Sequence, residues 1–186
     1  MRIEGRVLAV TVGILVAVGG ILGMIGGIHQ VMEGLGYIRP AEKMGQRYAD
    51  TSHGCSYLVP EDWDKSDGKN GAVVFRGKRG RNLRVLTEAF PGTLQQYVDA
   101  SVAQIKKMFP DASVLSDEKM QTEKGSEAVK VMLDNKVEKV GLRQLIACYD
   151  GKAGQKIMVV STVEAGDWGA TQPVLDACAK SLELLP

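Results

Sequence analysis

The residues that could carry out chemistry in this chain are few and scattered. His29 and His53 are its only histidines, and His53 and Cys55 place two potential metal ligands close together. Two ligands do not complete a zinc site, and no second pair follows at a ligand spacing. Two histidines leave few general bases, and no serine lies in a G-x-S-x-G turn. We therefore predict no metal site, no cofactor and no enzymatic activity.

Other reactive groups have simpler interpretations. Cys55, Cys148 and Cys178 are too few for a disulfide scaffold and show no C-x2-C spacing. Two of them fall on apolar positions of predicted elements, which favours buried thiols over a bridged pair with one thiol left over. The carboxylates around Trp63 suggest acid–base chemistry, but a polar loop is the favoured interpretation. Trp63 and Trp168 are expected to cap the core, a protein contact being the alternative.

Five basic residues lie within nine positions at a predicted hairpin: Arg76, Lys78, Arg79, Arg81 and Arg84. Such a cluster can contact anionic lipid headgroups or an acidic protein surface, with about 1 kcal/mol per charge near a membrane. A solvated hairpin tip is an equally good interpretation. Nucleic acid is not an expected partner, because aromatic residues are only 5% of the chain and the 23 basic residues are balanced by 22 acidic ones.

The N-terminal region predicts a membrane anchor. Residues 7–28 read VLAVTVGILVAVGGILGMIGGI, 22 residues without a charge. As a helix they would extend about 33 Å, against a hydrocarbon core of about 30 Å. The run is longer than the apolar part of a signal peptide and no clear A-x-A cleavage site follows it, so we expect a retained transmembrane helix after a short tail of residues 1–6.

Charge on either side of this run predicts its orientation. Arg2, Arg6 and the terminal amine precede it, whereas residues 29–38 contain no lysine or arginine. Cytoplasmic flanks are usually the more basic ones. We therefore expect a single-pass protein of a bacterial-type inner membrane, with the N-terminus in the cytoplasm and the C-terminal domain in the periplasm or another extracytoplasmic space. His29 would lie at the interface, and residues 29–51 would form a linker.

The glycines of the anchor are its most specific feature. One set recurs every four residues and another every seven, so that both lie on one side of a helix: Gly13, Gly19, Gly20, Gly23 and Gly27. In lipid, a face without side chains serves chiefly to let a second backbone approach closely. The predicted partner is a transmembrane helix of a larger complex or of a second copy. Glycine is also common in membrane helices generally.

The rest of the chain predicts strands and two helices. Thr93 and Gln96 form a capping-box pattern before a helix with apolar positions at intervals of three or four, ended by Pro110. A final helix is expected over residues 171–184. Alternating or apolar runs predict strands at 56–59, 72–75, 83–90, around Val114, and at 128–133, 142–149 and 156–163, with turns at Asn135 and at 150–151. This order predicts an α+β fold with an antiparallel sheet covered by helices.

The stretch YLVPEDW at residues 57–63 is a strand that ends in proline and tryptophan. Together with the order of elements after it, it resembles the PsbP-like and DcrB-like sandwich family over about residues 55–185. The resemblance implies a PsbP-like domain over residues 52–186 and a non-enzymatic, extracytoplasmic accessory role, some members being attached to photosynthetic or other membrane complexes. It carries over no functional residue.

These observations together predict an accessory or scaffolding subunit of a larger membrane-protein complex, for example a photosynthetic or electron-transfer complex, held through the glycine face of its anchor. The alternative is a tethered extracytoplasmic module that binds a small ligand or lipid. The sequence does not identify the complex or a ligand.

Overall fold

The computed structural model describes residues 42–186. The predicted tail and anchor, most of the predicted linker and the glycines Gly13, Gly19, Gly20, Gly23 and Gly27 lie outside the described residues. The strands and helices, in chain order, are β1 (Met44–Asp50), β2 (Cys55–Pro60), β3 (Asp64–Asp67), β4 (Val73–Arg76), β5 (Asn82–Ala89), α2 (Leu94–Met108), β6 (Ser113–Gln121), β7 (Glu127–Val137), β8 (Val140–Asp150), β9 (Gln155–Glu164), α3 (Trp168–Lys180) and β10 (Glu183–Leu184).

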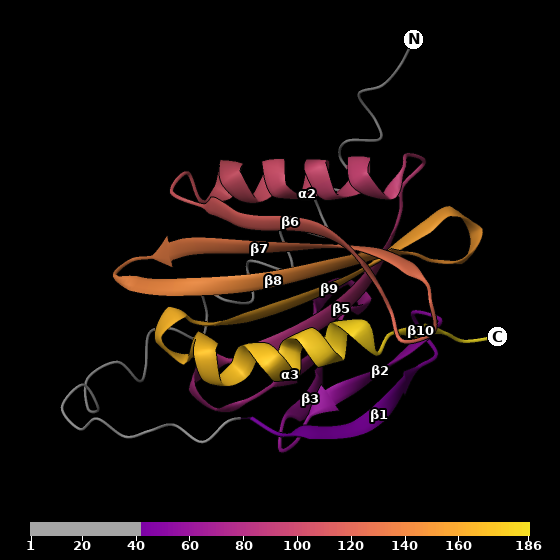
Figure 1. Cartoon of the computed structure of the whole chain (residues 1–186), viewed down its shortest axis with the longest axis horizontal. Coiled ribbons are helices and arrows are strands. Elements are labelled where there is room, and N and C mark those ends of the chain that lie inside the picture. The colour runs from indigo at the N-terminus through magenta and orange to yellow at the C-terminus, as the bar shows by residue number, and fades with distance from the viewer. Residues whose placement is uncertain (1–41) are drawn as a thin grey trace, which may run out of the picture.

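The described chain forms two antiparallel sheets. The large sheet has seven strands in the order β3-β4-β5-β9-β8-β7-β6, and the small sheet has the order β1-β2-β10. Helix α2 covers one face of the large sheet, while α3 and the small sheet lie on the other (Figure 1). The predicted α+β class, with an antiparallel sheet covered by helices, is confirmed. Neither helix of residues 42–186 is long and apolar enough to cross a membrane.

Each face of the large sheet has its own core. Val131, Ile146 and Val160 are directly paired across β7, β8 and β9 and pack with α2. Their sequence neighbours, such as Leu145 and Val159, point to the opposite face and pack with α3 and β2. Because successive strand residues alternate between two covered faces, β9 is buried along nearly its whole length.

Helix α2 begins and ends as its sequence predicts. The Thr93 hydroxyl accepts a hydrogen bond from the Gln96 backbone N–H, and the Gln96 side chain accepts one from the Thr93 backbone N–H. The helix ends before Pro110. Helix α3 begins earlier than predicted, at Trp168, and the residues after Lys180 leave it to form β10.

Part of the predicted linker is a strand. Met44–Asp50 forms β1 and pairs with β2 along an antiparallel register. The tether predicted to run to Thr51 is therefore corrected, and the folded body includes β1. The sequence did not reveal this strand because it lies at a sheet edge and only its last residue, Asp50, is fully buried, so it lacks an apolar repeat.

The structure differs from the sequence analysis at two further points. The four-residue edge strand β3 was not predicted, because its sequence DKSD is entirely polar and mostly exposed. The turn predicted at Asn135 is wrong: this residue lies within β7, and the turn comes at Glu138, which has a φ of 56°. The Asn135 amide donates a 3.0 Å hydrogen bond to the Gln144 side chain of β8, which is how a turn-forming residue is accommodated inside a strand.

Candidate functional site

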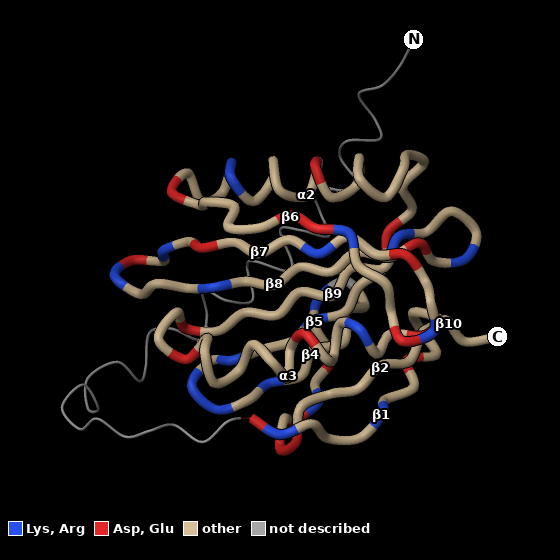
Figure 2. Tube along the Cα trace, in the orientation of Figure 1, with Lys and Arg blue, Asp and Glu red and all other residues tan. Residues whose placement is uncertain are grey.

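The predicted basic hairpin is the β4–β5 connection, with a short 3-10 turn at Lys78–Gly80. Its arginines leave the hairpin toward different sides. Figure 2 shows basic and acidic residues interspersed along the described chain. The charge of the hairpin therefore depends on which acidic side chains lie next to it. The structure divides the five predicted residues into a pair with carboxylate partners, a pair without such partners, and the exposed Lys78.

Arg79 and Arg81 are the pair with carboxylate partners. Arg81 Nη2 lies 2.9 Å from Asp167 Oδ2, and Arg79 Nη1 lies 3.6 Å from the other oxygen of this buried carboxylate. Arg81 also pairs with Glu42. Since Asp167 directly precedes α3, these contacts tie the hairpin to the start of that helix. Their positive charge is balanced within the described chain.

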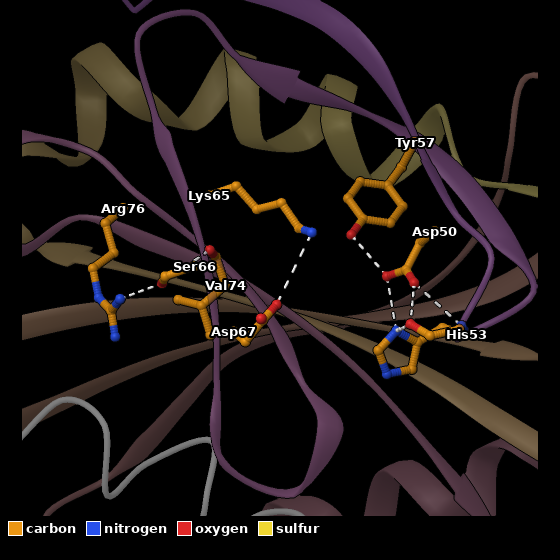
Figure 3. Close-up of polar contacts among 9 residues, drawn as sticks. Asp50, His53, Tyr57, Lys65, Ser66, Asp67, Val74 and Arg76 are labelled. Atoms are coloured by element: carbon orange, nitrogen blue, oxygen red, sulfur yellow. Dashed lines mark hydrogen bonds and ion pairs between the residues drawn. The ribbon is translucent and has the colours of Figure 1, made fainter.

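Arg76 and Arg84 lie on the other side of the strands, facing the α2 layer. Arg76 donates a hydrogen bond to the Ser66 hydroxyl (Figure 3). The Arg84 side chain is 5% exposed, and its Nε and Nη1 have no hydrogen-bond partner within residues 42–186. Burial and the nearby charge of Arg76 both lower the pKa of Arg84. The positive charges of these two guanidiniums have no carboxylate partner among the described residues.

A second polar group closes the turn between β1 and β2. His53 Nδ1 lies 2.8 Å from Asp50 Oδ2, and the Tyr57 hydroxyl donates to the same oxygen at 3.2 Å. The Ser52 hydroxyl donates to Asp50 Oδ1 at 2.6 Å. Burial raises the pKa of the Asp50 carboxyl, but the hydrogen bonds from His53 and Ser52 outweigh it and leave the pKa below its usual value. We call Asp50, Ser52, His53 and Tyr57 the Asp50 network.

The structure separates His53 and Cys55, the two potential metal ligands that the sequence places close together. His53 turns its ring nitrogen toward Asp50, while the Cys55 thiol is fully buried. Burial and the charge of Asp50 raise the pKa of Cys55 to about 12, so the thiol stays protonated at neutral pH. No group of three or more histidine, cysteine and acidic side chains gathers as a metal site among residues 42–186.

The remaining candidates have structural roles. Cys55, Cys148 and Cys178 are free and buried, which confirms that they act as small apolar side chains. Trp63 and Trp168 are 9% and 5% exposed, which confirms their expected place in the core. The carboxylates beside Trp63 are exposed: Glu61 and Asp62 lie in the expected polar loop, whereas Asp64 begins β3.

The structure also contains a cavity whose position no sequence motif indicated. It has a volume of about 710 Å³ and lies where the start of α2 meets the ends of β6 and β7. Its lining includes apolar groups from Leu94, Met120 and Val129 and charged groups of both signs from Lys119 and Glu127. These side chains come from three separate elements, and no sequence motif links them.

Comparison with known proteins identifies the type of fold. No protein-family model and no curated protein matches the chain. The solution structure of cyanobacterial PsbP (CyanoP) from Synechocystis sp. PCC 6803 superposes with a TM-score of 0.61 at 20% identity, covering 85% of this chain and 99% of that one. The chain has a PsbP/Mog1-like α+β fold.

Two further structures show how widely this fold is used. The Ran-binding protein Mog1p of Saccharomyces cerevisiae has a TM-score of 0.59 at 10% identity, covering 77% of this chain and 97% of its own. LpqN, involved in cell envelope biogenesis of Mycobacterium tuberculosis, has a TM-score of 0.51 at 8% identity, covering 71% and 83%. At such identities the likeness concerns the fold alone, and function must be argued from this chain's own residues.

Proposed function

We propose that this protein is a non-enzymatic accessory or scaffolding subunit of a larger membrane-protein complex. Residues 7–28 anchor it as a single transmembrane helix, with the N-terminus in the cytoplasm and the PsbP/Mog1-like domain in the periplasm or another extracytoplasmic space. The glycine face of the anchor packs on transmembrane helices of the complex. The folded domain covers or steadies an extramembrane surface there.

One observation carries this proposal: an uncharged run of 22 residues holds glycines at 19, 23 and 27. A helix advances 100° per residue, so these three positions share one side, and a run of this length matches the bilayer. Small residues in such a register permit close packing of helix backbones. The fold is compatible with this role, since cyanobacterial PsbP shares it.

The first prediction tests the glycine face. Replacing Gly19, Gly23 and Gly27 together with leucine adds side chains where the partner backbone must approach, so the chain should separate from its complex in mild detergent. The measurement is the amount of each co-purifying membrane protein recovered with the tagged full chain. We expect at least a tenfold loss.

A matched control places three leucines on the opposite side of the same helix. Val18, Ile21 and Ile25 lie there in the 100° projection, and their replacement by leucine keeps the segment equally apolar. This variant should keep its partners. If both triple variants co-purify with the same proteins as the wild type, packing through the glycine face is ruled out.

The cavity at the start of α2 favours a second candidate, a tethered module that binds a small ligand or lipid. Its volume of about 710 Å³ falls within the usual range for small-molecule sites, roughly 300–1,000 Å³. In that case the glycine variants would be silent. Native mass spectrometry of the full chain from its own membrane would then show a bound small molecule, which Val129→Trp in the cavity wall should remove.

A further inference from the structure

Four arginines lie at the β4–β5 hairpin, and only two of them are paired with a carboxylate within residues 42–186. Arg79 and Arg81 meet Asp167 on the α3 side. On the α2 side, Arg76 donates to the Ser66 hydroxyl, and Arg84 Nε and Nη1 have no hydrogen-bond partner within residues 42–186. A buried guanidinium usually has a partner, because leaving a polar group unsatisfied in the interior is unfavourable, and more so when the group is charged.

The strand register puts Arg76 and Arg84 beside each other. Val74 of β4 is paired with Arg84 of β5, and Arg76 is paired with Asn82. Directly paired residues point to the same face, so the two arginines are diagonal neighbours, at a typical separation of about 7–8 Å. Leu83 and Val85 point to the α3 face, which places Arg84 toward α2. The lowered pKa of Arg84, caused by burial and by the charge of Arg76, is consistent with this proximity.

Polar side chains continue from this pair across the sheet. Arg76, Asn82, Thr162 and Gln144 are opposite one another on β4, β5, β9 and β8. The Gln144 amide donates a 3.2 Å hydrogen bond to the Thr162 hydroxyl. At the edge, Ser66 of β3 accepts from Arg76 and is paired with Val74. Neutral donors and acceptors therefore flank the two charges, while no anion among the described residues balances them.

We propose that Arg76 and Arg84 bind one oxyanion of the phosphate class on the α2-facing side of β4 and β5. A carboxylate can be satisfied by a single guanidinium fork, whereas the three outer oxygens of a phosphate group can accept from two guanidiniums at once. Arg84 holds the group from the buried side. Arg76, which is half-buried, meets it from the solvent side and Ser66 orients the Arg76 guanidinium.

The test is a phosphate titration of the full chain in a neutral detergent and phosphate-free buffer, followed by thermal unfolding. Inorganic phosphate should raise the unfolding temperature of the wild type beyond the effect of chloride at equal ionic strength. Arg84→Gln and Arg76→Gln should each weaken the apparent phosphate affinity at least tenfold. Because Arg84 is buried and its variant could fail to fold, the half-buried Arg76 provides the second, independent variant.

Lys78→Gln is the matched control, since it removes one positive charge from the same hairpin at an exposed side chain. It should change the affinity less than twofold. A general electrostatic effect of a basic hairpin would instead weaken binding equally in all three variants, and that result would overturn the proposal.

A second arm distinguishes the sources of the phosphate group. The same variants are titrated with dihexanoyl phosphatidylglycerol, a soluble anionic lipid, and with dihexanoyl phosphatidylcholine as its zwitterionic counterpart. Arginine-dependent binding of phosphatidylglycerol without binding of inorganic phosphate assigns the site to a lipid headgroup, and the reverse assigns it to free phosphate. If neither ligand binds in an arginine-dependent way, the proposed site does not exist. These outcomes are independent of the glycine-face experiment.

Discussion

At the scale of single residues, the buried carboxylate of Asp50 is the centre of the hydrogen bonds in the β1–β2 turn. It accepts hydrogen bonds from Ser52, His53 and Tyr57, so one side chain holds the turn and the following strand together. Hydrogen bonds to a charged acceptor are worth about 1.5–3 kcal/mol each in favourable cases. The Asp50 network therefore stabilises the small sheet.

Replacing Asp50 with asparagine should lower the free energy of unfolding by about 1–3 kcal/mol at neutral pH, because the amide cannot accept the same set of charge-assisted hydrogen bonds. Urea denaturation at pH 7 measures this change. Asp62→Asn is the control, since this exposed residue has a φ of 61°, which asparagine tolerates well. Equal midpoints for the two variants would contradict a stabilising role for the Asp50 network.

The same carboxylate predicts a dependence of stability on pH. Its pKa is lower in the folded protein than in the unfolded chain, where it is about 3.9, so its contribution is complete above pH 4 and is lost as pH falls through the lower folded value. Wild-type stability should therefore decline more steeply below pH 4 than that of Asp50→Asn. Denaturation midpoints measured from pH 6 to pH 2 test this difference, and parallel curves would contradict it.

At the scale of elements, the β2–β3 and β4–β5 connections meet at one close contact. An added Cβ at Gly77 would lie 2.6 Å from the indole of Trp63, a rigid and buried side chain. The glycine thus lets the end of β4 pack directly on the tryptophan that precedes β3.

Gly77→Ala should destabilise the protein by about 1–3 kcal/mol, because the methyl group overpacks against Trp63. Gly169→Ala is the matched control: it lies in α3 with nothing within 4 Å of an added Cβ, and alanine favours a helix by up to about 1 kcal/mol. Thermal unfolding should show opposite shifts for the two variants. A Gly77→Ala protein as stable as wild type would show that Trp63 can move aside at little cost.

The elements also show what a sequence can predict. The interior strands and α2 were predicted because apolar periodicity and a capping box are local signals. The strands β1 and β3 were missed because sheet edges can be polar. The pairing of Arg81 with Asp167 joins residues 86 positions apart, and no local pattern indicates it. The basic cluster was thus found in the sequence, but its division into two pairs required the register of the sheet.

At the scale of the whole molecule, the described domain is a sheet with two covered faces, each with its own core. Its fold is shared by proteins as different as a Ran-binding protein and one involved in cell envelope biogenesis. The fold alone therefore does not determine the function of this domain. The proposed role rests on combining this domain with the glycine-patterned run at residues 7–28. In this account, the anchor selects the partner and the domain acts on the partner's outer surface.

The central claim is tested most directly by isolating the full chain from its native membrane in mild detergent, separating complexes by size and identifying what migrates with it. The account predicts that the chain resists alkaline extraction from the membrane and migrates in a complex with at least one other integral membrane protein. A chain that is released by alkaline extraction, or that migrates alone, would contradict it.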